Sequence, residues 1–188
     1  RGIIATDHTY HGNTTAVAQL SATNPSRYGV ADHVRFVPAP DSYRPLGGEA
    51  GPAHAAAFAR AVEDAITDLE DSGVGFGGII LCPSFVNEGF PMLDEGWLDP
   101  ALAAVRKAGG LFIADEVQPG FGRNGSHMWG HQRIKAEPDI VTLGKPMGNG
   151  HPIAGLVTTP EIMAGFRNSF RYFNTYGGNP VSVAAANA

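Results

Sequence analysis

The sequence has little cysteine and no long apolar run. Cys82 is the only cysteine among 188 residues, so no disulfide can form within the chain. A lone thiol is typical of proteins from reducing compartments. No apolar run approaches the roughly 18–20 residues that a membrane-spanning helix requires. These features predict a cytoplasmic protein that makes no use of a membrane.

Clustered positive charge is missing as well. The chain contains 13 Lys and Arg against 18 Asp and Glu, which gives a formal net charge of -5, and no Lys/Arg-rich stretch stands out. Nucleic-acid binding depends on clustered positive charge that neutralises phosphates, so we expect no nucleic-acid partner. Apolar residues make up 43% of the chain, which is enough for a packed core.

Short apolar runs alternate with helical patterns along the chain. Strands are predicted at residues 2–6, 34–37, 78–82, 111–114, 140–143 and 153–158. Helices are predicted from Thr14 to about Leu20, over 53–69, after an N-cap at Asp99, from about Pro160 and from Asn179-Pro180. Residues 22–32 and 41–52 are predicted as loops, and 117–139 as one long irregular stretch. This alternation predicts an α/β fold with a mostly parallel sheet.

Two polar residues directly follow predicted strands. Asp115 comes after the apolar run 111–114, and Lys145 follows the run 140–143 and Gly144. Ligands of open α/β sheets bind at the carboxyl ends of the strands. We therefore expect Asp115 and Lys145 to lie in one crevice.

Several short motifs imitate known sites. The run 73–78 matches the dinucleotide pattern G-x-G-x-x-G, but it precedes a predicted strand and follows a helix, which is the wrong order, so a flexible turn is the better interpretation. Gly144-Lys145 resembles the end of a P-loop, but Pro146 stands where a Ser or Thr is needed. The pairs His8/His11 and His127/His131 lack a second ligand cluster, so no metal site is predicted.

An amine-converting enzyme that uses pyridoxal phosphate needs four kinds of group. A lysine holds the aldehyde as a Schiff base and later moves a proton. A carboxylate keeps the pyridine nitrogen protonated, because a nearby negative charge favours the charged form. An aromatic or apolar wall holds the ring, and hydrogen-bond donors hold the phosphate. Lys145, Asp115, Tyr10 and Thr175 are candidates of these types, although each alone is a weak signal.

Taken in order, four segments resemble the class III (omega/ornithine-type) aminotransferases, which are fold-type I enzymes. The segments are residues 9–14 (TYHGNT), 112–123 (FIADEVQPGFGR), 138–145 (PDIVTLGK) and 173–180 (FNTYGGNP). The resemblance implies the large domain of that family, a three-layer α-β-α fold with a mostly parallel sheet.

The resemblance also implies roles for individual residues. Lys145 would form the Schiff base with pyridoxal 5'-phosphate, Asp115 would pair with the pyridine nitrogen, Val117 would pack on the ring and Gln118 would reach the ring hydroxyl. Tyr10, in the turn with His11 and Gly12, would stack on the cofactor ring. In the family, the threonine at the place of Thr175 reaches the phosphate of the neighbouring subunit, which implies a homodimer with a shared active site.

The sequence departs from the family in two ways. Cys82 stands where the family often has a glutamate, which puts the substrate class in doubt, and the thiol is interpreted as a small strand residue and not as a nucleophile. The family's upstream Gly-Ser-x-Ala turn for the phosphate is missing. Residues 1–188 are therefore interpreted as the central part of the large domain, without the N-terminal segment and the C-terminal small domain.

Three hypotheses follow. The first is a transaminase that moves an amino group from an amine or amino acid to a keto acid or aldehyde. The second is a lyase, similar to the phospho-lyases that resemble this family. The third is a non-catalytic piece of such an enzyme that associates with other chains.

Overall fold

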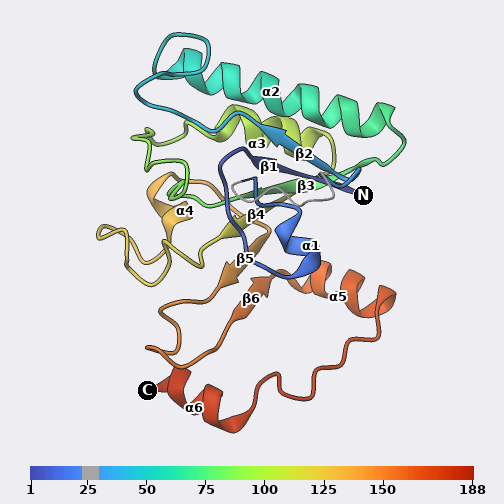
Figure 1. Ribbon diagram of the computed structural model, residues 1–188, viewed down its shortest axis with the longest axis vertical. Helices are drawn as coiled ribbons and strands as arrows, with labels where there is room; N and C mark the ends of the chain where they lie inside the picture. Colours follow the sequence, from blue (N-terminus) through green and yellow to red (C-terminus); the bar gives the residue numbers. More distant parts are fainter. Residues whose placement is uncertain (23–29) are drawn as a thin grey trace.

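Six strands form a single sheet in the computed structural model, which describes residues 1–22 and 30–188 (Figure 1). Their spatial order is β2-β1-β3-β4-β5-β6. The first five strands in this order are parallel, and β6 is antiparallel to β5. The strands are β1 (Gly2–Thr6), β2 (Val34–Val37), β3 (Phe76–Leu81), β4 (Leu111–Asp115), β5 (Ile140–Leu143) and β6 (Gly155–Thr158). The predicted α/β class with a mostly parallel sheet is confirmed.

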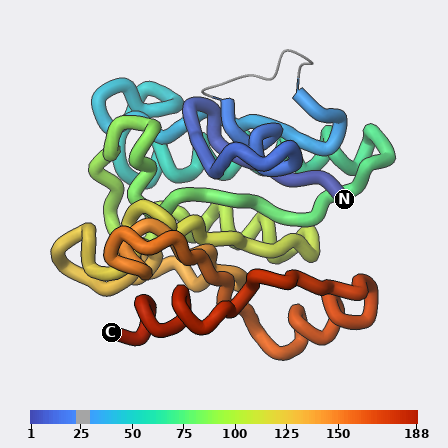
Figure 2. Tube along the Cα trace, turned by 60° about the horizontal axis from the view of Figure 1, so that its bottom comes forward, coloured from blue at the N-terminus to red at the C-terminus, as the bar shows by residue number. Residues whose placement is uncertain are grey.

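The helices lie on both sides of the sheet. They are α1 (Thr15–Ala18), α2 (Pro52–Asp71), α3 (Asp99–Lys107), α4 (Gly130–Arg133), α5 (Pro160–Ser169) and α6 (Pro180–Asn187). The helix α2 packs on β1, β2 and β3, and α3 packs on β4 and on α2. Comparison of the two views places α1 on the opposite side of the sheet from α3 (Figures 1 and 2). The helices α5 and α6 flank the β6 end of the molecule.

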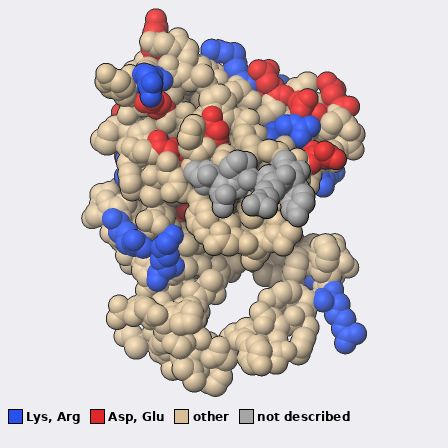
Figure 3. All heavy atoms as spheres, in the orientation of Figure 1, with Lys and Arg blue, Asp and Glu red and all other residues tan. Residues whose placement is uncertain are grey.

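The main core lies between the sheet and the helices α2 and α3. The predicted apolar face of α2 is buried, with Phe58, Val62 and Leu69 fully inaccessible to solvent. They meet strand residues such as Ile79 and Phe112, which are also fully buried. The opposite face of α2 is charged, and Figure 3 shows acidic side chains gathered over this part of the surface. The apolar face that the helical spacing predicts is thus the face by which α2 packs on one side of the sheet.

An aspartate fixes the register between β4 and β5. The side chain of Asp139 accepts a hydrogen bond from Phe112 N (2.7 Å) and forms an ion pair with Arg106 of α3. In addition, Asp139 N donates to Phe112 O (2.9 Å). This double link places Asp115 opposite Thr142 in the ladder. Residues near the amino ends of β4 and β5 therefore align the carboxyl ends of these strands, where Asp115 and the segment leading to Lys145 lie.

Several predicted boundaries differ from the structure. The stretch 117–139, predicted as irregular, contains the short helix α4, and β3 spans Phe76–Leu81 and not 78–82. The helix expected over Thr14–Leu20 covers only Thr15–Ala18, because no side chain caps its start and the chain then turns so that Ser21 Oγ accepts from His11 N (3.0 Å). The strand expected over 153–158 begins at Gly155, because its only described partner, β5, ends at Leu143 opposite that residue. Asp99 is the first helical residue of α3 and not its N-cap.

Two further findings complete the fold. The loop predicted over residues 22–32 falls largely on residues 23–29, which lie outside the described residues. Across residues 1–22 and 30–188, no helix combines the length and the apolar character needed to cross a membrane.

Candidate active site

Four loops meet at the carboxyl ends of β1, β3, β4 and β5. They enclose a cavity of about 300 Å³. Its walls are formed by Tyr10, His11, Gly12, Cys82, Val86, Asn87, Asp115, Val117, Gln118 and Lys145. Neighbouring parallel strands bring these loops together, as the position of ligand sites in open α/β sheets predicts.

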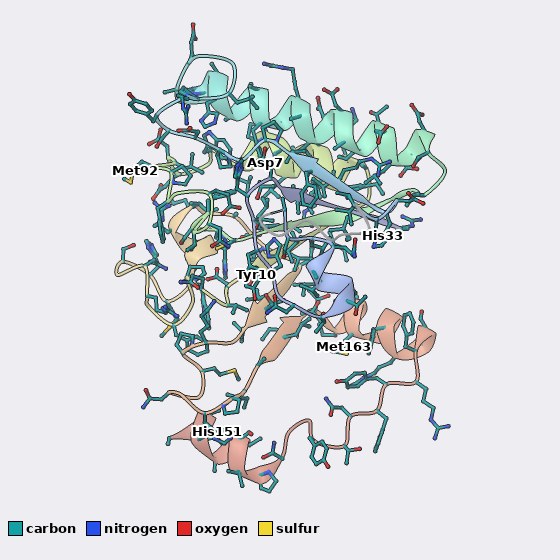
Figure 4. The ribbon with its side chains drawn as sticks, viewed as in Figure 1. Asp7, Tyr10, His33, Met92, His151 and Met163 are labelled. Carbon is teal, nitrogen blue, oxygen red and sulfur yellow. The ribbon has the colours of Figure 1, made fainter. Side chains whose placement is uncertain are left out.

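The structure brings together seven of the eight residues that the sequence predicts as cofactor ligands. Asp115 and Lys145 line the same cavity, as expected from their positions after neighbouring strands. Tyr10 lies on the loop after β1 near the centre of the molecule (Figure 4). Thr175 does not line the cavity. It lies in an exposed turn between α5 and α6, so its role stays a prediction.

A hydrogen-bond network fixes the carboxylate of Asp115. Its Oδ2 lies 2.6 Å from His11 Nδ1, and the two side chains are almost fully buried, at 9% and 1% exposure. Its Oδ1 accepts hydrogen bonds from Val117 N and Thr142 Oγ1, both at 3.1 Å. Behind the pair, His11 Nε2 lies 3.1 Å from Thr9 Oγ1. Buried polar groups held by several partners have a defined orientation, so Asp115 presents a fixed carboxylate to the cavity.

The glycine before Lys145 lies close to the side chain of Val117. A Cβ atom on Gly144 would lie 3.1 Å from Val117 Cγ1, which is tighter than most contacts of this kind. Glycine therefore allows the end of β5 to approach the loop after β4. Lys145 follows Gly144, and both Lys145 and Val117 line the cavity.

The loop after β3 supplies an uncharged wall. Cys82 is buried, and burial raises the pKa of its thiol from 9.0 to about 12. The thiol is therefore neutral at physiological pH, which agrees with the interpretation that Cys82 is not a nucleophile. The prediction of a strand residue is wrong, because β3 ends at Leu81. Val86 and Asn87 complete this wall. The sequence reasoning missed both as site residues, although they follow a strand end as Asp115 and Lys145 do.

The structure shows the surroundings of two of the motifs that imitate known sites. Residues 73–75 form the turn from α2 to β3, with Gly73 and Gly75 at positive φ, whereas residues 76–78 are the start of β3 and not part of the predicted turn. His131 bonds to Glu116 at 2.8 Å and His8 to Asp7 at 3.1 Å. Within the described ranges, no three His, Cys, Asp or Glu side chains are grouped so that they could hold a metal ion.

The cavity matches one part of a pyridoxal phosphate molecule. It offers a carboxylate, an amine, an amide and an aromatic residue around one hollow, which are the groups that an aldehyde-bearing pyridine ring requires. Apart from Lys145, no Lys or Arg lies among the described residues of its wall. The ring therefore fits the residues present, whereas donors for the phosphate must come from other segments.

Comparisons with known proteins agree with this geometry. The family described as "Aminotransferase class-III" matches residues 1–188. An "Alanine--glyoxylate aminotransferase 2-like" protein of Drosophila melanogaster is 41% identical over 99% of this chain and 39% of its own length. An "Alanine--glyoxylate aminotransferase 2 homolog 2, mitochondrial" of Arabidopsis thaliana is 41% identical over 97% of this chain and 37% of its own.

A solved structure gives the same result for the fold. A phospholyase from Arthrobacter, in complex with phosphoethanolamine, matches with a TM-score of 0.89 and 42% identity. The match covers 99% of this chain and 44% of that protein. The chain thus spans about two fifths of the length of these relatives.

Proposed function

The chain belongs to the class-III aminotransferase family, and on this premise we propose that it carries the cofactor site of a pyridoxal-phosphate-dependent aminotransferase. The observation that supports the proposal most directly is the presence of Asp115 and Lys145 in one cavity of about 300 Å³. Alanine as amino donor and glyoxylate as acceptor are the first substrates to test, because the relatives are named for them.

Pyridoxal phosphate supplies an aldehyde that condenses with amines and a ring that accepts electrons from the substrate carbon. Lys145 Nζ would hold the aldehyde, and its amine, once released, would be the group that moves a proton at the substrate carbon. The Asp115 carboxylate, held by His11, Val117 N and Thr142, would pair with the ring nitrogen and keep that nitrogen protonated. Tyr10 and Val117 would confine the ring, and Gln118 would contact its hydroxyl.

The phosphate and the second subunit form a separate part of the proposal. The cavity wall provides only Lys145 as a cation, so donors from outside it are needed. Thr175 is exposed and lies outside this cavity, which suits a residue that reaches the phosphate of a neighbouring subunit. We propose a homodimer on this basis. We also propose that residues 1–188 form the central part of the large domain.

Covalent trapping tests the role of Lys145. The complete polypeptide is mixed with pyridoxal phosphate, reduced with borohydride, digested and analysed by mass spectrometry. We expect one reduced cofactor on the peptide that contains Lys145, together with a visible absorbance band before reduction that survives desalting. Lys145→Ala should lose both signals, and Lys107→Ala, on the exposed end of α3, should keep them. A cofactor attached to another lysine in the unmodified protein would refute the assignment.

A lyase is the second candidate, favoured by the 42% identity to the Arthrobacter phospholyase and by the uncharged Cys82 at the place of the family's acid. Incubation with phosphoethanolamine separates the two functions. Release of inorganic phosphate without a keto acid indicates a lyase, whereas conversion of glyoxylate to glycine in the presence of alanine indicates a transaminase. A chain that retains cofactor but yields neither product matches the third hypothesis, a non-catalytic piece. A cytoplasmic location stays a prediction from the single cysteine, and one of the relatives is named as mitochondrial.

A further inference from the structure

A second carboxylate, beside the proposed ring-binding aspartate, is buried completely. Glu116 follows Asp115 directly and has an exposure of 0%. Its Oε2 accepts a hydrogen bond from Gly130 N at 2.8 Å. Its Oε1 accepts one from His131 N and lies next to His131 Nδ1, both at 2.8 Å. A buried carboxylate is costly unless it is fully hydrogen-bonded, and here both oxygens are bonded to a single short segment at the start of α4.

These bonds close the loop formed by residues 117–129. At its start, Gly120 N donates to Glu116 O (2.9 Å), and a Cβ atom on Gly120 would lie only 2.7 Å from that oxygen. Further along, the rings of Phe121 and Trp129 meet edge to face at 5.0 Å. The loop therefore leaves the sheet at Glu116 and returns to the side chain of the same residue. Its first two residues, Val117 and Gln118, line the cavity.

We propose that Glu116 is a positioning residue, which closes the 117–129 loop on α4 and thereby holds Val117 and Gln118 against the cofactor ring. The inference rests on the proposed function for the identity of the ligand. Glu116 does not line the cavity, so it acts through its two neighbours in the chain. Without the link to Gly130 and His131, the end of the loop keeps the bond from Trp129 N to Gln132 Oε1 (3.1 Å) but loses its tie to Glu116 at the end of β4. We therefore expect Gln118 to lose its fixed position.

The test compares cofactor binding in matched variants of the complete polypeptide. Glu116→Gln keeps the size of the side chain but leaves one amide N–H group facing a backbone donor. We expect it to raise the dissociation constant for pyridoxal phosphate by roughly 10- to 100-fold. The visible band should shift in the same direction as in Gln118→Ala. Glu137→Gln, an exposed glutamate beyond α4, is the control and should bind as the unmodified protein does.

A double variant shows whether Glu116 acts through Gln118. The increase in the dissociation constant for Glu116→Gln combined with Gln118→Ala should fall short of the product of the two single increases by about threefold or more. Increases that multiply fully, or an unchanged dissociation constant in Glu116→Gln, would overturn the proposal. If Glu116→Gln does not fold, His131→Leu removes only the side-chain contact and should show the same band shift with a smaller loss of binding.

Hydrogen exchange keeps this inference apart from the proposed function. Exchange of the amides in 119–129 should accelerate in Glu116→Gln, measured without cofactor, and not in Glu137→Gln. Unchanged exchange would overturn the closure of the loop. If the unmodified protein retains no pyridoxal phosphate but the exchange accelerates as expected, the proposed function fails, and with it the role toward the cofactor, while the closure by Glu116 stands.

Discussion

The buried thiol of Cys82 should make stability depend on pH in the alkaline range. Burial raises its pKa in the folded protein to about 12, from 9.0 for an ordinary thiol. Below pH 9 the thiol is neutral in both the folded and the unfolded chain, so it has no effect. Above pH 9 the unfolded chain releases the proton and the folded protein does not, which favours unfolding.

The size of the effect follows from the two pKa values. At pH 10, the unfolded thiol is mostly ionised and the folded thiol is not, which lowers the free energy of unfolding by about 1.4 kcal/mol. The loss approaches about 4 kcal/mol above pH 12. The thiol therefore costs no stability well below pH 9, and the loss grows as the pH rises from 9 toward 12.

Denaturant titrations at pH 8, 9 and 10 measure this loss. Other groups also titrate in this range, so the informative quantity is the difference between the unmodified protein and Cys82→Ala. We expect this difference to change by about 1.4 kcal/mol between pH 8 and pH 10, with Cys82→Ala being the less sensitive protein. A constant difference would mean that the folded thiol ionises near its ordinary pKa. The wall formed by the loop after β3 could then carry a negative charge, as the family's glutamate does.

Two further predictions concern the scaffold that supports the site. Asp139→Ala should lower the free energy of unfolding by about 1–3 kcal/mol, because Phe112 N and Arg106 lose their shared partner; chemical denaturation measures the loss, and an unchanged midpoint would refute the role of Asp139 in the register. Phe58→Ala should cost about 3–5 kcal/mol, because its ring is fully buried between α2 and the sheet. The control Met92→Ala, at a side chain that is 80% exposed, should stay within about 0.5 kcal/mol of the unmodified protein, and equal losses in the two variants would contradict the assignment of the core.

Local patterns were sufficient to predict most of the fold. Apolar runs bounded by Gly or Pro located all six strands, and the spacing of Phe58, Val62, Ile66 and Leu69 located α2. The antiparallel direction of β6 could not be predicted, because a short apolar run has the same sequence pattern in a parallel and in an antiparallel strand. The length of β6 depends on where β5 ends, which is a property of the pair and not of the segment.

The candidate site was predictable where chemistry and order along the chain agreed. Asp115 and Lys145 follow neighbouring strands, so their meeting was expected. The contact of His11 with Asp115 joins residues 104 positions apart, and no local pattern indicates it. No local pattern indicates the hydrogen bonds of Glu116 to Gly130 and His131 either. Val86 and Asn87 lie in a loop without periodicity, and only the position of β3 between β1 and β4 brings them to the cavity.

The assembly of the cavity from four separated loops has a consequence for how the protein folds. The cavity is complete only when β1, β3, β4 and β5 lie side by side. Parallel strands joined by long crossovers pair slowly during folding. A ligand that binds only the finished sheet stabilises it by mass action. A ligand bound in this cavity therefore favours the chain with all four strands in place over forms in which one of these strands has detached.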